Sequence, residues 1–131
     1  MRLAKFNLSL GTQIMKALGD EARLRVLNLL IKKGSMTISD LEHVLDFTQT
    51  KTSRHITYLK NSGMLLSQKI DQWVVYTIKD EVYDIVQQFV GFVEKDKQLK
   101  EDLDVYNTLF NNRELAQNKI QPRRWQTLKS I

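Results

Sequence analysis

Residues 39–63 read SDLEHVLDFTQTKTSRHITYLKNSG, and they predict two helices joined by a very short connection. Ser39 and Glu42 have the spacing of a capping box, in which the serine caps the helix and the glutamate side chain reaches back. A short helix is therefore expected over residues 40–45. A second helix is expected over residues 49–61, and so short a connection is typical of a helix-turn-helix.

The second helix has one side suited to a protein core and another suited to a polar partner. Thr48 is its expected N-cap, and Gly63 is expected to end it. At about 100° per residue, the side that should pack inward holds Thr52, Ile56 and Leu59. The helix contains no acidic residue. A solvated face is the simpler interpretation, but the helix-turn-helix spacing favours DNA.

Hydrogen-bonding and cationic side chains on this helix define the predicted DNA interface. Lys and Arg pair with phosphates or with guanine, and Thr contacts phosphate or the thymine methyl group. We expect backbone contacts from Lys51 and from basic residues of the amino-terminal part, and sequence preference from Gln49, Thr50 and Arg54. The predicted DNA-binding residues are Gln49, Thr50, Lys51, Ser53, Arg54, Thr57 and Tyr58, with Lys69 from the next element.

Two helices are expected before this region and a β-hairpin after it. Periodic apolar residues and caps predict helices over residues 6–18 and 21–33, and β-branched and aromatic residues predict strands over 64–70 and 73–78. Asp20 is the expected N-cap of the second helix, and Gly34 suits its C-terminus. Asp71 and Gln72 form the expected hairpin turn, and Trp73 is expected to pack on the hairpin.

The remaining chain is again helical and more apolar than one buried face requires. Residues 82–93 carry apolar side chains over most of the helix, so a second copy of the chain is the expected cover. A further stripe comprises Leu99, Leu103, Tyr106 and Phe110. The predicted dimer interface comprises Leu10, Ile14, Phe89, Val93, Leu103 and Tyr106. Tyr83, Phe89 and Phe92 are expected in the dimer core, with an effector pocket as the alternative.

The predicted fold class is mainly α with a β-hairpin, a winged helix-turn-helix (α+β) with flanking N- and C-terminal dimerisation helices. Residues 1–110 form the expected DNA-binding and dimerisation domain, and residues 111–131 a basic C-terminal extension. In that extension Trp125, Leu128 and Ile131 argue against full disorder. It is expected either to dock on the dimer or to bring Arg123 and Arg124 to phosphate.

Composition agrees with one domain that binds an anionic partner. The chain has 131 residues and a net charge of +5, with seven basic and two acidic residues in 1–33 but three basic and seven acidic in 81–110. There is no cysteine, which excludes disulfides, thiolate metal sites and cysteine nucleophiles. With neither a membrane-length apolar run nor a secretion signal, the expected location is cytoplasmic.

Four blocks of the sequence resemble the ArsR/SmtB winged-helix repressors. Residues 17–27, ALGDEARLRVL, resemble the family's ALADPTRLRIL block, and residues 48–56, TQTKTSRHI, resemble its SQSTVSRHL recognition-helix block. Residues 59–65, LKNSGML, are similar to LREAGLV, and residues 73–76 resemble the returning wing strand. The resemblance implies a homodimer held by the first helix and the helix after the wing, with an operator whose repression an effector relieves.

The departures from the family pattern concern metal and the wing. Where metal-sensing members carry Cys-Val-Cys, this chain has Thr37, Ile38 and Ser39, and residues 81–96 hold carboxylates but no histidine. No metal and no cofactor are therefore expected. Family wings usually carry two arginines and a glycine turn, whereas here the positions hold Gln68, Lys69 and Asp71. With one cation, the wing should contact phosphate more weakly.

The hypothesis is a homodimeric repressor that binds double-stranded DNA at an inverted-repeat operator, without a membrane partner. The main alternative is a winged-helix protein-interaction module with no DNA partner. A metal sensor with oxygen and histidine ligands is a second alternative, although His43 and His55 fall on different predicted helices. An enzyme is the third, and the sequence shows no catalytic constellation. The sequence indicates no particular effector.

Overall fold

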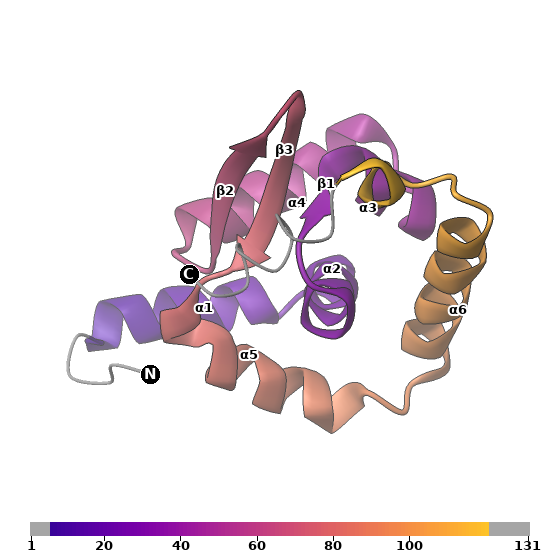
Figure 1. Cartoon of the computed structure of the whole chain (residues 1–131). Coiled ribbons are helices and arrows are strands. Elements are labelled where there is room, and N and C mark those ends of the chain that lie inside the picture. Colours follow the sequence, from indigo (N-terminus) through magenta and orange to yellow (C-terminus); the bar gives the residue numbers. More distant parts are fainter. Residues whose placement is uncertain (1–5, 121–131) are drawn as a thin grey trace.

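A computed structural model describes residues 6–120, and its elements follow the predicted order closely (Figure 1). The helices are α1 (Leu8–Leu18), α2 (Glu21–Lys33), α3 (Ile38–Leu45), α4 (Gln49–Asn61), α5 (Asp80–Val93), α6 (Lys97–Asn111) and the short 3-10 helix η2 (Ala116–Lys119). The strands are β1 (Met36–Thr37), β2 (Leu65–Ile70) and β3 (Trp73–Ile78). They form one antiparallel sheet in the order β1-β3-β2.

Local signals placed several boundaries correctly. The bounds of α2, α4 and β3 match the predicted ranges, and Asp20 and Thr48 are the N-caps of α2 and α4. The hairpin turn is also confirmed, since Ile70 pairs with Trp73 across the two residues between them. Helix α4 ends at Asn61 with Ser62 as its C-cap, and the following Gly63 has a φ of 80°, in the left-handed region that glycine adopts without strain.

The predicted N-cap of α3 is wrong. Thr37, not Ser39, caps the helix, and its hydroxyl accepts a hydrogen bond from the backbone N–H of Asp40 at 3.1 Å. Thr37 has the extended backbone of an N-cap because it ends β1, where it pairs with Val75. The capping box of Ser39 with Glu42 was therefore misplaced by two residues, and the sequence did not reveal the two-residue strand β1.

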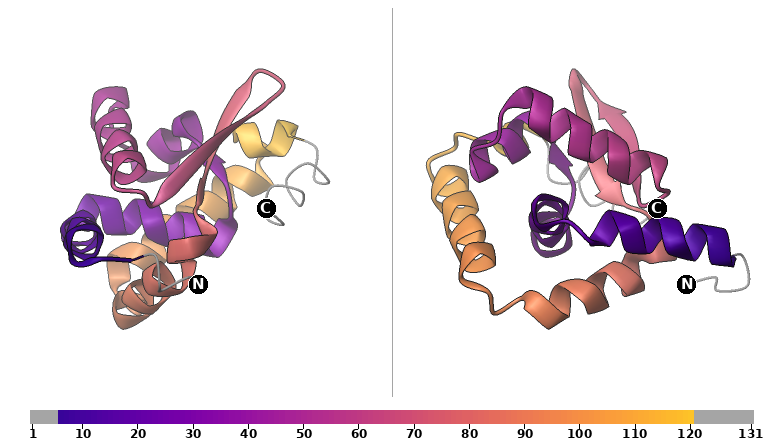
Figure 2. Two further views of the ribbon diagram at one scale, coloured as in Figure 1. Left: turned by 90° about the vertical axis from the view of Figure 1, so that its left-hand side faces the viewer. Right: turned by 180° about the vertical axis from the view of Figure 1, so that it is seen from behind.

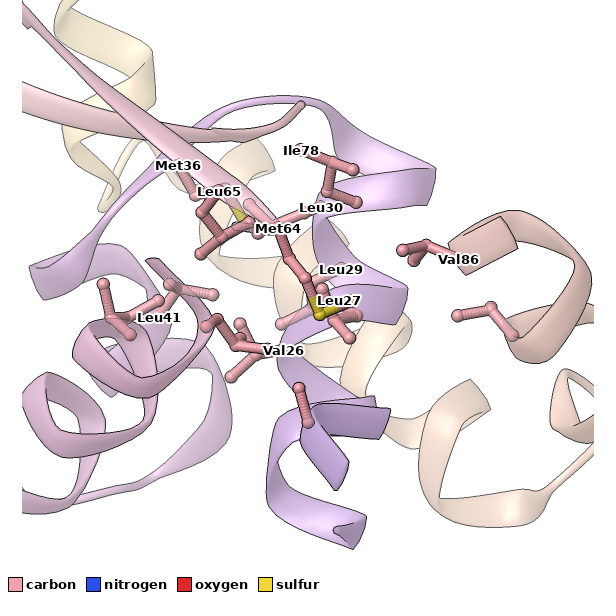
Figure 3. Close-up of a cluster of buried hydrophobic side chains, with 14 of the residues drawn as sticks. Val26, Leu27, Leu29, Leu30, Met36, Leu41, Met64, Leu65, Ile78 and Val86 are labelled. Carbon is pink, nitrogen blue, oxygen red and sulfur yellow. The ribbon is translucent and has the colours of Figure 1, made fainter. Parts of the chain in front are cut away.

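Helix α2 is the centre of the molecule. Helices α1, α4, α5 and α6 and strand β3 all pack against it, and most of its sides are therefore covered (Figures 1 and 2). Leu27 and Leu29 of α2 are fully buried. The close-up shows α2 side chains in one cluster with Met64, which precedes β2, with Leu65 of β2 and with Val86 of α5 (Figure 3). This core fixes the hairpin and α5 relative to one another.

The part of the chain after α5 packs onto the helix-turn-helix. Helix α6 contacts α2 and α3, and η2 contacts α3 and β1. Leu115 is fully buried, and Ile120 forms a small cluster with Ile70 and Val75 of the hairpin. Trp73 packs against the same cluster, as predicted. The packed body thus continues to Ile120, ten residues beyond the predicted boundary at 110.

Side-chain hydrogen bonds hold η2 in place. The carboxylate of Asp40 accepts hydrogen bonds from the backbone N–H groups of Ala116, at 2.7 Å, and Gln117, at 3.0 Å. The Tyr106 hydroxyl donates to the side chain of Gln117, and burial raises the pKa of Tyr106 to about 12. That phenol remains a hydrogen-bond donor at neutral pH. The predictions for Arg123, Arg124, Trp125, Leu128 and Ile131 lie outside the described residues.

Between residues 6 and 120, none of the helices combines the length and the apolar character that crossing a bilayer requires.

Candidate nucleic-acid interface

The turn between α3 and α4 is fixed by backbone geometry and a side-chain cap. Asp46 adopts the left-handed conformation, with φ 57°, and the N–H of Phe47 donates to the carbonyl of Glu42 at 3.2 Å. Aspartate tolerates this conformation better than most residues do. The hydroxyl of Thr48 then accepts from the N–H of Lys51 at 3.1 Å. These contacts set the direction in which α4 leaves the turn.

Helix α4 buries the side predicted to face the core. Thr52, Ile56 and Leu59 are at most 2% exposed. This packing leaves the predicted DNA-binding side outward, and α4 lies in front of the hairpin in the view from behind (Figure 2, right). Five of the predicted residues are exposed, namely Gln49, Thr50, Arg54, Thr57 and Tyr58, and two are partly buried, namely Lys51 and Ser53.

Arg23 is a candidate interface residue that the sequence did not single out. Its guanidinium lies over the ring of Tyr58, 4.1 Å from the ring centroid. The same group donates to the carbonyls of Lys16 and Ala17, at 3.0 and 2.8 Å, where α1 ends. Arg23 thereby brings a positive charge beside α4 and orients Tyr58. Its position in the ALGDEARLRVL block was the available signal, but the contact partner is 35 residues away.

A second ring, that of Phe47 in the turn, lies close to two cations. The ammonium of Lys51 is 4.0 Å from its centroid, and the guanidinium of Arg25 is 5.1 Å away. Cations near an aromatic ring are attracted by its quadrupole. The Lys51 side chain is therefore held beside the first turn of α4.

The hairpin stands next to α4 as a wing. Lys69 is exposed near its tip and pairs across the sheet with Val74, which is 42% exposed. The ammonium of Lys60 at the end of α4 donates to the Ser67 hydroxyl of β2 at 3.1 Å. This hydrogen bond connects α4 to the wing, so both elements present their polar groups as one surface.

His55 lies on the inner flank of α4 and is only 5% exposed. Its Nδ1 atom has no hydrogen-bond partner in residues 6–120. Burial lowers the pKa of His55; the carboxylate of Asp20 opposes the shift, while Arg23, Arg54 and Lys51 reinforce it. The neutral imidazole is therefore the form that the fold accommodates.

Acidification should destabilise the protein through His55. The unfolded chain takes up a proton as the pH falls through about 6.5, whereas the folded chain resists it until a lower pH. Stability contributed by this group is thus full above pH 6.5 and is lost as the pH falls toward the lowered pKa. Urea denaturation between pH 8 and 5 should show this loss of unfolding free energy. In His55→Gln the unfolding free energy should depend less steeply on pH. His43→Gln, a change at an exposed histidine, is the control. If the slope of unfolding free energy against pH is the same in His55→Gln as in the wild type, His55 is not the source of the loss.

The predicted dimer residues divide into two groups. Ile14 and Tyr106 are buried within the protomer, whereas Leu10, Phe89 and Leu103 are partly buried and Val93 is 38% exposed. The more exposed apolar side chains are Leu8 (88%), Met15 (55%) and Phe92 (84%). Leu8 and Met15 line a hollow of about 650 Å³ that also includes Ile85 of α5. The predicted dimer residues Ile14 and Tyr106 therefore pack inward, and the exposed apolar side chains of α1 and α5 are Leu8, Met15 and Phe92.

Within the described chain there is no cluster of three or more His, Cys, Asp or Glu side chains that could hold a metal ion. Thr37, Ile38 and Ser39 form the end of β1 and the start of α3, and the carboxylates of α5 have no histidine among them.

A helix-turn-helix followed by a two-stranded wing, packed on α1, α2 and α5, defines a winged-helix protein. Comparison with known proteins identifies the family of winged-helix proteins: residues 20–67 match the family model described as bacterial regulatory protein, arsR family. The chain is 34% identical over 77 residues to the arsenic resistance transcriptional regulator ArsR2 of Pseudomonas putida, covering 59% of this chain and 67% of that protein. The protein belongs to the ArsR family.

Two further similarities agree with this assignment. The arsenical resistance operon repressor of Escherichia coli is 40% identical over 73 residues, but the match spans only 56% of this chain and 62% of the repressor. The homodimeric winged helix-turn-helix DNA-binding domain Mb0332 of Mycobacterium bovis, a possible ArsR-family regulator, superposes with a TM-score of 0.59. It is 25% identical, covering 76% of this chain and 89% of that domain. The fold and the relatives are those of transcriptional regulators rather than enzymes.

Proposed function

We propose that this protein is a homodimeric transcriptional repressor that binds an inverted-repeat operator through α4. The observation that carries the proposal is the outward face of α4, which exposes Gln49, Thr50 and Arg54 and has no acidic side chain. A recognition helix of a helix-turn-helix lies in the major groove, with its N-terminal residues at the base edges. Such a regulator acts in the cytoplasm, where the operator lies.

The contacts divide into backbone and base contacts. Lys51 and Arg23 lie at the edges of α4 and supply positive charge for phosphates, while Lys69 at the wing supplies one further cation. Arg54, in the middle of the helix, can reach guanine with two hydrogen bonds. A single wing cation should make the wing the weaker part of the interface.

Two copies are needed to read an inverted repeat. The exposed Leu8 and Met15 of α1 line the hollow of about 650 Å³ together with Ile85 of α5, and Phe92 adds an exposed apolar side chain near the end of α5. A C2 dimer covers such a surface with the same surface of the second copy. It would place the two α4 helices in successive major grooves, about 34 Å apart.

Genomic-fragment selection with the purified protein at two salt concentrations tests the function. Recovery of a short inverted repeat whose binding weakens steeply with salt is the expected result, because phosphate contacts release counterions. The genes beside the repeat would then suggest the effector. Recovery of unrelated fragments alone, or binding insensitive to salt, would overturn the proposal and favour a winged-helix module that binds another protein.

The dimer surface can be tested with Phe92→Asp. Phe92 is 84% exposed and its ring lies edge-to-face with Phe89, with centroids 6.2 Å apart. Burying a charge there in place of an aromatic ring should raise the dimer dissociation constant at least about tenfold. Sedimentation equilibrium measures it directly. Val105→Asp, on α6 and 41% exposed, is the matched control and should leave the dimer intact; equal weakening by both variants would contradict the assigned surface.

A further inference from the structure

Helix α6 lies outside the stretch that matches the family model, yet it reaches into the helix-turn-helix region. The carboxylate of Asp102, with a side chain 3% exposed, accepts two hydrogen bonds from the guanidinium of Arg25, each at 2.9 Å. Gln98 donates to the same carboxylate at 3.0 Å. The hydrogen bond to Asp102 raises the pKa of Arg25. Such a bidentate pair, with two parallel N–H···O hydrogen bonds, fixes the orientation of the guanidinium.

Arg25 in turn touches the turn that precedes α4. Its guanidinium carbon is 5.1 Å from the Phe47 ring centroid, and the Lys51 ammonium is 4.0 Å from the same centroid. Two cations beside one ring repel each other. The carboxylate of Asp102 offsets the charge of Arg25, and it thereby lowers the repulsion that Lys51 meets at the ring.

We propose that Phe47 holds the Lys51 ammonium at the first turn of α4 for contact with a DNA phosphate, and that Asp102 is a positioning residue that limits the repulsion of Lys51 by Arg25. The proposal rests on the DNA-binding function proposed above. The amide groups and dipole of a helix N-terminus favour phosphate, and the Lys51 ammonium adds a full charge at that place. A lysine already held in one conformation loses less entropy when it meets its phosphate.

The consequence is that a helix outside the matched stretch adjusts operator affinity without touching DNA. Asp102 is buried, and the series connects it to α4 through Arg25 of α2 and Phe47 of the turn. This contact series, Asp102–Arg25–Phe47–Lys51, joins residues that are 77 positions apart at its first step. A change in the placement of α6 would therefore alter the phosphate contact of Lys51.

A double-mutant cycle tests the contact series Asp102–Arg25–Phe47–Lys51. It measures affinity for the operator duplex that the genomic-fragment selection recovers. Lys51→Gln should weaken binding about fivefold and reduce the slope of log affinity against log salt by about 1. Asp102→Asn and Phe47→Leu should each weaken binding about threefold, and neither should add to the loss in a Lys51→Gln background. Asp104→Asn changes an exposed carboxylate on the same helix and should leave affinity and slope unchanged.

A spectroscopic readout separates positioning from general loosening of the fold. In the free protein the ring of Phe47 should shift the Lys51 ε-methylene proton resonance upfield. Asp102→Asn should move that resonance toward its random-coil position, and Asp104→Asn should not. Circular dichroism checks that each variant is folded, and Phe47→Leu gives a second route if Asp102→Asn is unstable.

The outcomes distinguish this inference from the function on which it rests. If the wild-type protein shows no salt-dependent operator binding, the proposed function fails and takes the inference with it. If the wild type binds but the losses from Asp102→Asn and Lys51→Gln add in full, the inference alone is overturned. An unchanged Lys51 resonance in folded Asp102→Asn also overturns it.

Discussion

Replacement of Arg54 by alanine is expected to weaken operator binding by about 1–3 kcal/mol, or roughly 5- to 150-fold. Arg54 is exposed in the middle of the outward face of α4, and the buried Thr52, Ile56 and Leu59 hold that face in place. A bidentate contact from arginine to guanine contributes about this amount to base discrimination. Because the side chain is exposed, the free energy of unfolding should change by less than about 0.5 kcal/mol.

The measurement compares the operator with a scrambled duplex at one fixed salt concentration. If Arg54 reads a base, Arg54→Ala should reduce operator affinity more than scrambled-duplex affinity. Arg54→Lys keeps the charge but loses the bidentate hydrogen bonding of the guanidinium. Relative to Arg54→Ala, it should restore affinity for the scrambled duplex more than affinity for the operator. Lys100→Ala removes an exposed cation on α6 and serves as the control. Unchanged operator affinity in Arg54→Ala would show that α4 is not the recognition helix.

The largest expected effect on stability comes from Asp40→Ala. The carboxylate of Asp40 is 3% exposed and accepts from the backbone N–H groups of Ala116 and Gln117, at 2.7 and 3.0 Å. Burial raises the pKa of Asp40, and these two N–H groups oppose that rise. Removing the acceptor leaves two donors of η2 unpaired. We expect a loss of about 2–3 kcal/mol in the free energy of unfolding, net of the relieved cost of burying the charge.

Urea denaturation gives the stability, and amide hydrogen exchange locates the loss. In Asp40→Ala the amides of Ala116 and Gln117 should exchange much faster, while those of α2 should change only as global stability does. Asp84→Ala removes an exposed carboxylate of α5 and should change stability by less than about 0.5 kcal/mol. Retained protection at Ala116 and Gln117 in Asp40→Ala would show that Asp40 does not hold η2.

Local chemistry explains which parts of the fold could be predicted. Thr48 and Gly63 bound α4 through contacts within a few residues, and the periodicity of Thr52, Ile56 and Leu59 reports burial directly. The family resemblance also rests on this segment. The helix-turn-helix and the wing were therefore predictable, and so was the outward face of α4.

Contacts between distant residues account for what the sequence did not reveal. Thr37 replaces Ser39 as the cap of α3 because strand β1 places it there, and β1 exists only through its pairing with β3. Likewise Arg23 meets Tyr58, and Arg25 meets Asp102, across long stretches of chain. No pattern of short period encodes such pairs, so the contacts of Arg23 with Tyr58 and of Arg25 with Asp102 emerged only from the structure.

Contacts that hold the end of the chain also bear on the order of folding. The hydrogen bonds from Ala116 to Asp40 and from Arg25 to Asp102 close loops of 76 and 77 residues, whereas the caps of α2, α3 and α4 act over three residues. Loop-closure entropy delays contacts between such distant residues. During synthesis the helix-turn-helix should leave the ribosome well before Asp102 and Ala116, which hold Arg25 and α3 in place, so the nascent domain passes through a looser state that these later residues consolidate.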